Sequence, residues 1–263
     1  MGIPIKIHVS LLLLVLLFVL HVSSQGAGAV LLVLIDSAGI FASIALHELG
    51  HSFVAIRKGC RVREITLMFM GGMARMERLP SRPLDEFQMA AAGPAVSLCL
   101  GLAGFFGGRE LARHGLAYVG SVVYILGVAN FFLAGFNLLP SFPMDGGRLL
   151  RSALTPRLGR LRATFVAARL GKLLAVLFGV YAVIGRPGNW IILLAIAIFV
   201  YTAAGREYRY VEQQETAKRG AFWFRPPFET PVSGPPDENN EVIVGPPPYE
   251  KGPGVHTELH DER

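Results

Sequence analysis

Two histidines and a glutamate stand close together in the sequence HELGH at residues 47–51. Residues four apart on a helix share one face, so His47 and His51 have the geometry that binds a single zinc ion. Glu48 lies one step round the helix, where it can take a proton from a water at the metal rather than bind the metal itself. The same HExxH pattern arises by chance on solvated surface helices, so its surroundings decide its meaning.

Those surroundings are apolar. Residues 29–46, directly before the motif, are almost entirely Ala, Val, Leu, Ile, Phe and Gly. Ionisable groups at the end of such a run are costly to bury and are functional by default. The motif and its setting together predict a metal site inside a membrane segment.

The composition agrees with a membrane location. Of 263 residues, 52% are hydrophobic and only 17% are charged, whereas a soluble domain carries about 25% charged residues. The net charge of +6 comes from lysines and arginines in short clusters between apolar runs, as the positive-inside rule requires. The chain is therefore predicted to be an all-α polytopic membrane protein of the cell membrane, in contact with the lipid bilayer, and no nucleic-acid partner is indicated.

About six transmembrane helices are expected, with both termini cytoplasmic because the arginine-poor links face outward. The apolar runs cover about residues 9–22, 29–56, 88–106, 116–136, 163–184 and 189–204. The first run, with Lys6 before it and small residues at 26–29, also fits a cleavable signal peptide. A retained span is favoured, because the next apolar run follows those small residues almost at once.

Two links between the spans have distinct residue patterns. Val62, Ile65, Leu67 and Phe69 are spaced like strand residues, and the glycine pair at 71–72 can turn the chain, which predicts a short membrane-associated β-hairpin or loop after the second span. The strand at residues 62–69 could offer an edge to which an extended peptide segment adds as a further strand. Residues 148–162 carry five arginines and are expected to form a basic cytoplasmic loop.

The fourth apolar run ends in the sequence NLLPSFPMDGGR at residues 137–148. Two prolines and two glycines cannot continue an undistorted helix. Non-helical backbone at membrane depth is tolerated only when it is buried in protein or lines a water-filled cavity, so the break indicates a site. A catalytic zinc needs three protein ligands, and Asp145 offers the oxygen donor that the two histidines lack.

From residue 206 onward the composition shifts to charged residues, Pro and Gly. We therefore divide the chain into a transmembrane domain at residues 1–205, which carries the predicted metal site, and a cytoplasmic, Pro-rich, disordered tail at residues 206–263.

The two motifs together resemble the site-2 protease family of intramembrane zinc metalloproteases, whose paired signatures are HExxH and NxxPxxPxDG. Both patterns are present without departure, and the likeness covers about residues 3–204, including Ala-Gly-Pro at 92–94. The short links resemble the compact branch without a PDZ insert. Members often carry Asn three residues after the Gly-Pro pair, where this chain has Ser97.

The resemblance implies an intramembrane zinc metalloendopeptidase with one zinc ion held by His47, His51 and Asp145. It implies Glu48 as general base and acid, and Asn137 as a group that orients or stabilises the scissile carbonyl. The expected substrate is a membrane-anchored protein with a single span, cleaved within or near that span in regulated intramembrane proteolysis. Selection would then depend on the membrane core, the hairpin or an unseen regulatory partner.

Two other functions remain open at this point. A zinc or ion transporter also places His and Asp in its membrane segments, but it has no need of Glu48 as a base, and no half of the sequence mirrors the other as transporter repeats do. A non-catalytic membrane-protein binder of the same fold is disfavoured because Glu48 is intact.

Overall fold

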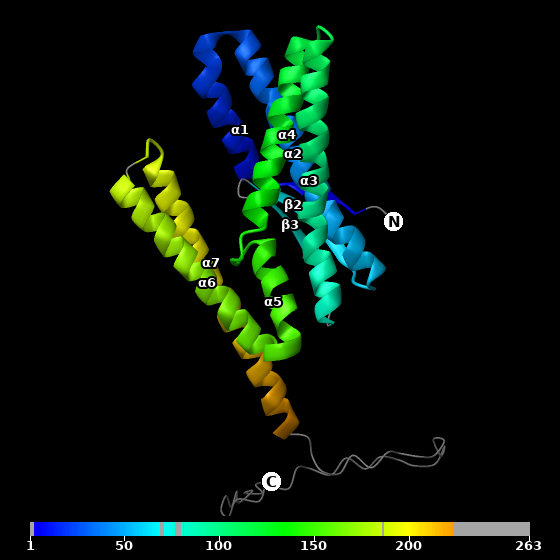
Figure 1. Cartoon of the computed structure of the whole chain (residues 1–263), viewed down its shortest axis with the longest axis vertical. Helices are drawn as coiled ribbons and strands as arrows, with labels where there is room; N and C mark the ends of the chain where they lie inside the picture. Colours follow the sequence, from blue (N-terminus) through cyan, green and yellow to red (C-terminus); the bar gives the residue numbers. More distant parts are fainter. Residues whose placement is uncertain (1–2, 69–70, 77–79, 81, 186, 224–263) are drawn as a thin grey trace, which may run out of the picture. The chain divides into compact units, whose positions relative to one another are not determined.

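The fold consists mainly of α-helices, as expected, with a small sheet near the N-terminus (Figure 1). This computed structural model describes residues 3–68, 71–76, 80, 82–185 and 187–223. The described residues up to Ala221 form one compact unit, and the candidate site residues all lie in it. Its helices, in chain order, are α1 (Val9–Val22), the 3-10 turn η1 (Ser23–Gln25), α2 (Ala27–Arg57), α3 (Pro83–Arg113), α4 (Ala117–Asn137), α5 (Asp145–Leu158), α6 (Arg160–Gly185) and α7 (Trp190–Trp223).

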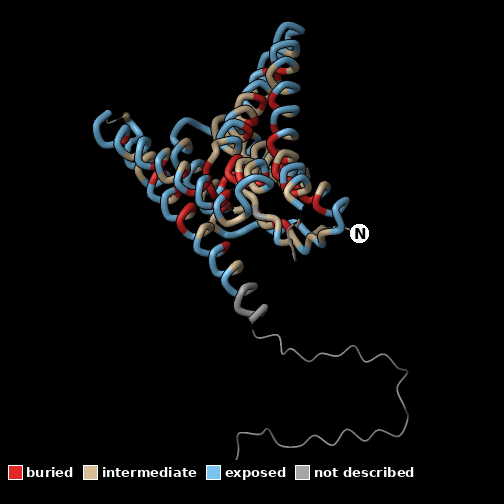
Figure 2. Tube along the Cα trace, turned by 60° about the horizontal axis from the view of Figure 1, so that its bottom comes forward, coloured by how far each residue is buried: buried red, intermediate tan, exposed pale blue. Residues whose placement is uncertain are grey.

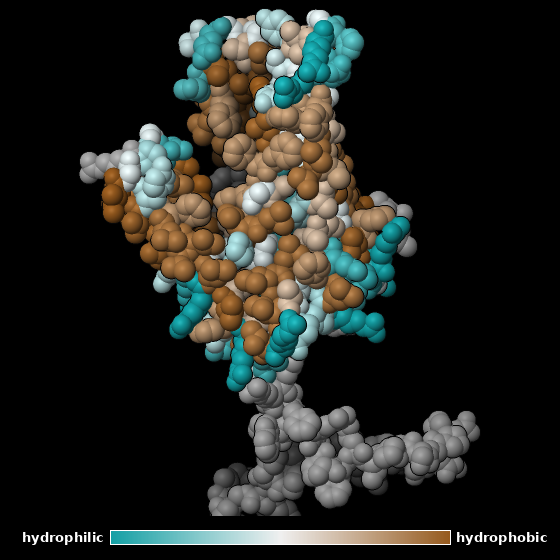
Figure 3. All heavy atoms as spheres, viewed as in Figure 1, coloured by the Kyte–Doolittle hydropathy of each residue, from teal (hydrophilic) through white to brown (hydrophobic). Residues whose placement is uncertain are grey.

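Within the described part of the chain, five helices are long and apolar enough to cross a membrane: α2, α3, α4, α6 and the 190–217 part of α7. Helix α1 is equally apolar but has only 14 residues before the η1 turn. Figure 3 shows apolar side chains over the middle of the visible face and polar ones toward its upper and lower ends. This pattern supports the multi-pass membrane prediction, with α1 as a shorter sixth apolar helix.

The expected hairpin is present. It pairs β2 (Val62–Met68) with β3 (Gly71–Met76) in antiparallel register. The glycine pair lies inside β3, opposite Met68 and Leu67, rather than at the turn. The turn residues 69 and 70, and hence the Phe69 part of the prediction, lie outside the described residues.

A third strand, β1 (Ile5–Ile7), was not expected. It pairs in parallel with β2, so that the strand order is β1-β2-β3. The prediction that residues 62–69 offer a free edge is therefore wrong, because β2 is the central strand of the sheet. The outer sides of the described sheet belong to β1 and β3.

The sheet packs on the membrane helices next to the HELGH motif. Ile65 and Leu67 of β2 are buried in one apolar cluster with Leu11 of α1, and Ile44 and Leu49 of α2 pack against that cluster. Figure 2 shows buried residues in the middle of the molecule and along the faces where helices pack together. The cluster therefore fixes the hairpin against the same helix that carries both histidines.

The stretch expected to be a basic loop is instead mostly helix. Helix α5 covers Asp145–Leu158 and is joined to α6 by Gly159, whose φ of +76° glycine adopts without strain. The prediction failed because charge was taken as a sign of a solvated loop, whereas Arg151 is completely buried. Helix α7 likewise continues past residue 205 to Trp223, and the rest of the expected tail lies outside the described residues.

Candidate metal centre

Three side chains that are far apart in the sequence meet at one point. Nε2 of His47 lies 3.2 Å from Nε2 of His51, and Oδ2 of Asp145 lies 3.2 Å and 3.0 Å from these two nitrogens. The exposed fractions of the three residues are only 3%, 6% and 8%, respectively. The histidines come from consecutive turns of α2, and Asp145 is the first residue of α5.

These separations fit one tetrahedral metal ion. Zinc lies about 2.0–2.2 Å from His nitrogen and carboxylate oxygen, which places tetrahedral donor atoms about 3.3 Å from one another. The three atoms form a group able to hold a metal ion, and their chemistry, two imidazoles and one carboxylate, is a donor set that catalytic zinc uses. The residues present therefore fit the metal expected from the sequence.

The outer nitrogen of each histidine ring has a hydrogen-bond partner on α3, and the partner of His51 fixes the tautomer that metal binding needs. Nδ1 of His51 lies 2.7 Å from the carbonyl oxygen of Met89, which can only accept, so this nitrogen carries the proton and Nε2 keeps its lone pair. Nδ1 of His47 lies 2.8 Å from Oγ of Ser97. Both partners belong to α3, so this helix orients the two imidazoles.

Helix α3 can come this close because of Gly93. A Cβ atom built there would lie 2.7 Å from Nε2 of His47 and still nearer to Nε2 of His51. Any side chain at this position would occupy the space in which the ligand atoms converge. The close approach of α3 to the two histidines therefore requires glycine at the middle of the Ala-Gly-Pro sequence.

Asp145 reaches the histidines because α4 stops at Asn137 and the chain turns before α5 begins. This confirms the predicted break.

Helix α5 is tied to its neighbours through Arg151. Its Nε donates to Oε1 of Glu86 on α3 at 2.9 Å, and its Nη1 donates to Oε1 of Glu207 on α7 at 2.6 Å. Arg151 also lies over the ring of Phe142 at 5.1 Å. The helix that begins with Asp145 is thus held by an ion cluster that joins three helices around the buried Arg151.

Glu48 and Asn137 lie outside the three-residue metal group. Glu48 follows His47 on α2 and lies against Gly72 of β3, where a Cβ atom would collide with Cγ of Glu48 and lie 3.0 Å from its Cδ. Asn137 is the last residue of α4, and its Nδ2 donates to the carbonyl oxygen of Leu133 at 2.9 Å.

Sequence reasoning missed the residues that orient the ligands. Ser97 stood out only as a departure from the family pattern, and its hydroxyl proves to be the partner of His47. The carbonyl oxygen of Met89 carries no side-chain signal at all. Gly72 and Gly93 were each noted within a motif, but what they accommodate depends on tertiary contacts.

A family model for peptidase family M50 matches residues 36–116 and 109–178, which together make up more than half of the chain. This chain belongs to peptidase family M50. The match includes both sequence motifs and all three residues of the metal group, so the expected family is confirmed.

Known proteins of this family are similar over most of the chain. A zinc metalloprotease of Methanocaldococcus jannaschii is 37% identical over 220 residues, which cover 83% of this chain and 61% of the relative. Rip3 of Mycobacterium tuberculosis is 34% identical over 235 residues, covering 81% of this chain and 58% of the relative. The chain thus spans about three fifths of the length of these M50 relatives.

A solved structure of a site-2 protease from Methanocaldococcus jannaschii matches with a TM-score of 0.57 and 33% sequence identity. The match covers 79% of this chain and 92% of that structure. The M50 chain therefore has the site-2 protease fold, and the predicted fold class is confirmed.

Proposed function

We propose that this M50 chain is an intramembrane zinc metalloprotease that hydrolyses a peptide bond within or near the membrane span of a membrane-anchored protein. One observation carries the proposal: two histidine nitrogens and a carboxylate oxygen converge within 3.2 Å of one another in a buried site. The helix that supplies both histidines is long and apolar enough to span a membrane. His47, His51 and Asp145 are the proposed zinc ligands.

When bound, zinc would polarise the scissile carbonyl and lower the pKa of the attacking water toward neutrality. Glu48 accepts one proton from that water as the water oxygen adds to the carbonyl carbon. Glu48 then delivers the proton to the amide nitrogen, the carbon–nitrogen bond breaks, and a carboxylic acid and an amine result. Cγ and Cδ of Glu48 lie against Gly72 of β3, which has no side chain there to displace them.

Asn137 has the second hydrogen of its Nδ2 available, because the first is bonded to Leu133. We assign it to donate to the carbonyl oxygen of the scissile bond as negative charge develops there. Only hydrogen bonds that strengthen in the transition state raise the rate, so loss of this amide is expected to lower kcat more than it raises KM.

The substrate must be extended where it is cut. Inside an α-helix each carbonyl is hydrogen-bonded and shielded by the next turn, so a substrate span has to unwind locally. The outer side of β3, beside Glu48, is the proposed place where the unwound segment adds as a strand. This replaces the edge on β2 expected from the sequence.

Several finer points of the proposal rest on the sequence pattern. They are a single-span substrate, selection assisted by a regulatory partner, both termini in the cytoplasm, and a division into a metalloprotease domain at residues 1–205 and a tail at residues 206–263. The arginine clusters support the orientation through the positive-inside rule.

The test compares membrane peptides in cells that express the wild type or Glu48→Gln. The glutamine keeps the shape of the side chain but cannot accept the proton, so uncut precursor spans should accumulate in the variant. Identical peptide profiles, with equal amounts of both proteins in the membrane, would overturn the proposal.

A further inference from the structure

A buried amide on α4 has one hydrogen-bonding atom left over. Asn130 is 3% exposed, and its Nδ2 donates to the carbonyl oxygen of Leu126 at 2.8 Å and to Oγ of Ser43 on α2 at 2.9 Å. Ser43 in turn donates its own hydrogen to the carbonyl oxygen of Gly39 at 2.9 Å. Oδ1 of Asn130 is buried without a hydrogen-bond partner among the described residues.

The orientation of this amide is fixed by its neighbours. If the amide were turned over, Oδ1 would face the carbonyl oxygen of Leu126, and two acceptors would meet without a hydrogen between them. The hydroxyl of Ser43 cannot rescue the turned amide either, because its one hydrogen is already bonded to Gly39. Oδ1 is therefore the atom left unsatisfied, and in a buried apolar setting that costs about 1–3 kcal/mol.

Asn130 lines a pocket of about 240 Å³ between α2 and α4. The other lining residues, apart from Ser43, are the apolar Ile40, Ile44, Ala129, Leu133 and Phe136. A water molecule needs two to four polar partners to be held in a cavity, and the side chains of these walls offer at most two, on Asn130 and Ser43. An unwound, apolar membrane span has a different donor to offer, namely the backbone N–H groups that lose their helical partners on unwinding.

We propose that Asn130 Oδ1 accepts a hydrogen bond from one backbone N–H of the unwound substrate and so forms a subsite beside the metal centre. This inference rests on the proposed protease function and names a residue that positions its substrate. Two groups that are each unsatisfied alone, the amide oxygen and the freed N–H, satisfy one another when the segment is bound.

The geometry also sets where along the substrate this contact falls. Ser43 lies four residues before His47 on α2, which is one turn or about 6 Å along the helix. An extended chain advances about 3.3 Å per residue. The N–H that meets Asn130 is therefore about two residues from the scissile bond.

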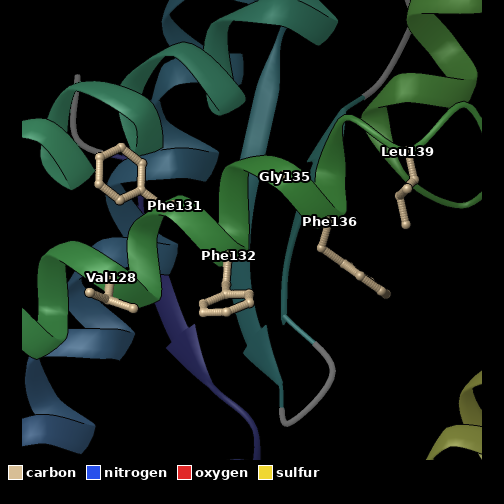
Figure 4. A pocket seen from close by; sticks show the side chains of 6 residues that line it. All are labelled: Val128, Phe131, Phe132, Gly135, Phe136 and Leu139. Carbon is tan, nitrogen blue, oxygen red and sulfur yellow. The ribbon is translucent and has the colours of Figure 1, made fainter.

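Access to the oxygen runs past Phe136. This side chain is 45% exposed and lines both the pocket at Asn130 and a neighbouring apolar pocket of about 370 Å³. Figure 4 shows Phe132 and Phe136 projecting from the same side of α4 in that neighbouring pocket. Since Oδ1 itself has almost no exposed surface, the incoming segment must displace such a wall residue to reach it.

The experiment uses the full-length protein and a synthetic peptide with one Leu/Ala span of about 20 residues, a central Gly-Pro and lysines at both ends. Single ester bonds replace successive amide bonds around the cleavage point, so each peptide lacks one N–H. In the wild type, one ester about two residues from the scissile bond should lower kcat/KM about tenfold. In Asn130→Leu the amide peptide should itself be cut about tenfold more slowly, and that ester should have no further effect.

Ser43→Ala is the matched control. It breaks the same hydrogen bond between α2 and α4 but leaves Oδ1 in place, held by the carbonyl oxygen of Leu126. The tenfold effect of the ester should therefore persist in Ser43→Ala. If Asn130→Leu and Ser43→Ala lose the ester effect alike, or if no ester position depends on residue 130, Asn130 is only a clamp between helices and the inference is overturned.

The same peptides can be bound to Glu48→Gln and to the double variant Glu48→Gln with Asn130→Leu. Equilibrium binding then reports the hydrogen bond without any turnover. A lack of cleavage by the wild type would contradict the protease function, whereas a lack of ester dependence in binding would contradict only the subsite. Asn130→Ala serves as the second variant if the leucine prevents folding, and the ester scan on the wild type needs no variant at all.

Discussion

Replacement of Gly93 by alanine should remove the metal without removing any ligand. The new Cβ would lie 2.7 Å from Nε2 of His47 and 2.5 Å from Cε1 of His51, whereas nonbonded carbon and nitrogen atoms prefer about 3.5 Å. Either α3 or the two rings must therefore move by about 1 Å. Metal sites tolerate errors of about 0.2 Å in ligand distance, so we expect zinc affinity to fall about 100-fold or more.

The assay is zinc competition against a chelator, with purified protein in detergent, together with the metal content by mass spectrometry. Gly107→Ala is the matched control, because it lies on the same helix and its new Cβ would meet nothing within 4 Å. That control should bind zinc normally. A Gly93→Ala protein that binds zinc within threefold of the wild type would refute the close approach of α3 to the ligands.

Three further variants test other parts of the site. Gly72→Ala should push Glu48 aside and lower kcat at least tenfold with zinc content unchanged; an unaltered kcat would remove β3 from the site. Arg151→Met leaves the buried carboxylate of Glu86 and the half-buried carboxylate of Glu207 without their partner. The loss should cost about 3–5 kcal/mol of stability, seen as a lower melting temperature in detergent, and an unchanged melting temperature would argue against the cluster. The hydrogen bond from Lys6 lowers the pKa of Glu64 below its ordinary 4.5. The Lys6–Glu64 pair should therefore protect β1 amides from hydrogen exchange above pH 4.5, and this protection should be lost as the pH falls through the lowered pKa. Equal protection in the wild type and Lys6→Met at every pH would contradict this role of the pair.

The metal site could be predicted from the sequence because its signals are local. The spacing of His47 and His51 defines one helix face, and the prolines before Asp145 force a break whatever the tertiary structure. What joins the two motifs is depth in the membrane, which apolar runs also indicate. Membrane helices have few ways to place such residues, so the three residues that could hold a metal ion were expected from two short patterns.

The parts that could not be predicted depend on contacts between distant segments. Three residues are too few to show a strand period, so β1 went unnoticed and β2 was taken for an edge. Arg151 was taken as a sign of a solvated loop, although two carboxylates from other helices allow its burial. Ser97 reaches His47 across a helix interface, and no feature of the sequence around it indicates that partner.

The central claim is that Glu48 and the zinc site cleave a peptide bond at membrane depth. The most direct measurement is cleavage of a single-span peptide by the purified protein in lipid vesicles, with zinc content determined on the same samples for the wild type, Glu48→Gln and Asp145→Ala. We predict that the wild type cuts within or near the span, that Glu48→Gln keeps its zinc but does not cut, and that Asp145→Ala loses both zinc and cleavage. Cleavage by zinc-loaded Glu48→Gln at the wild-type rate, or full zinc occupancy in Asp145→Ala, would contradict the account.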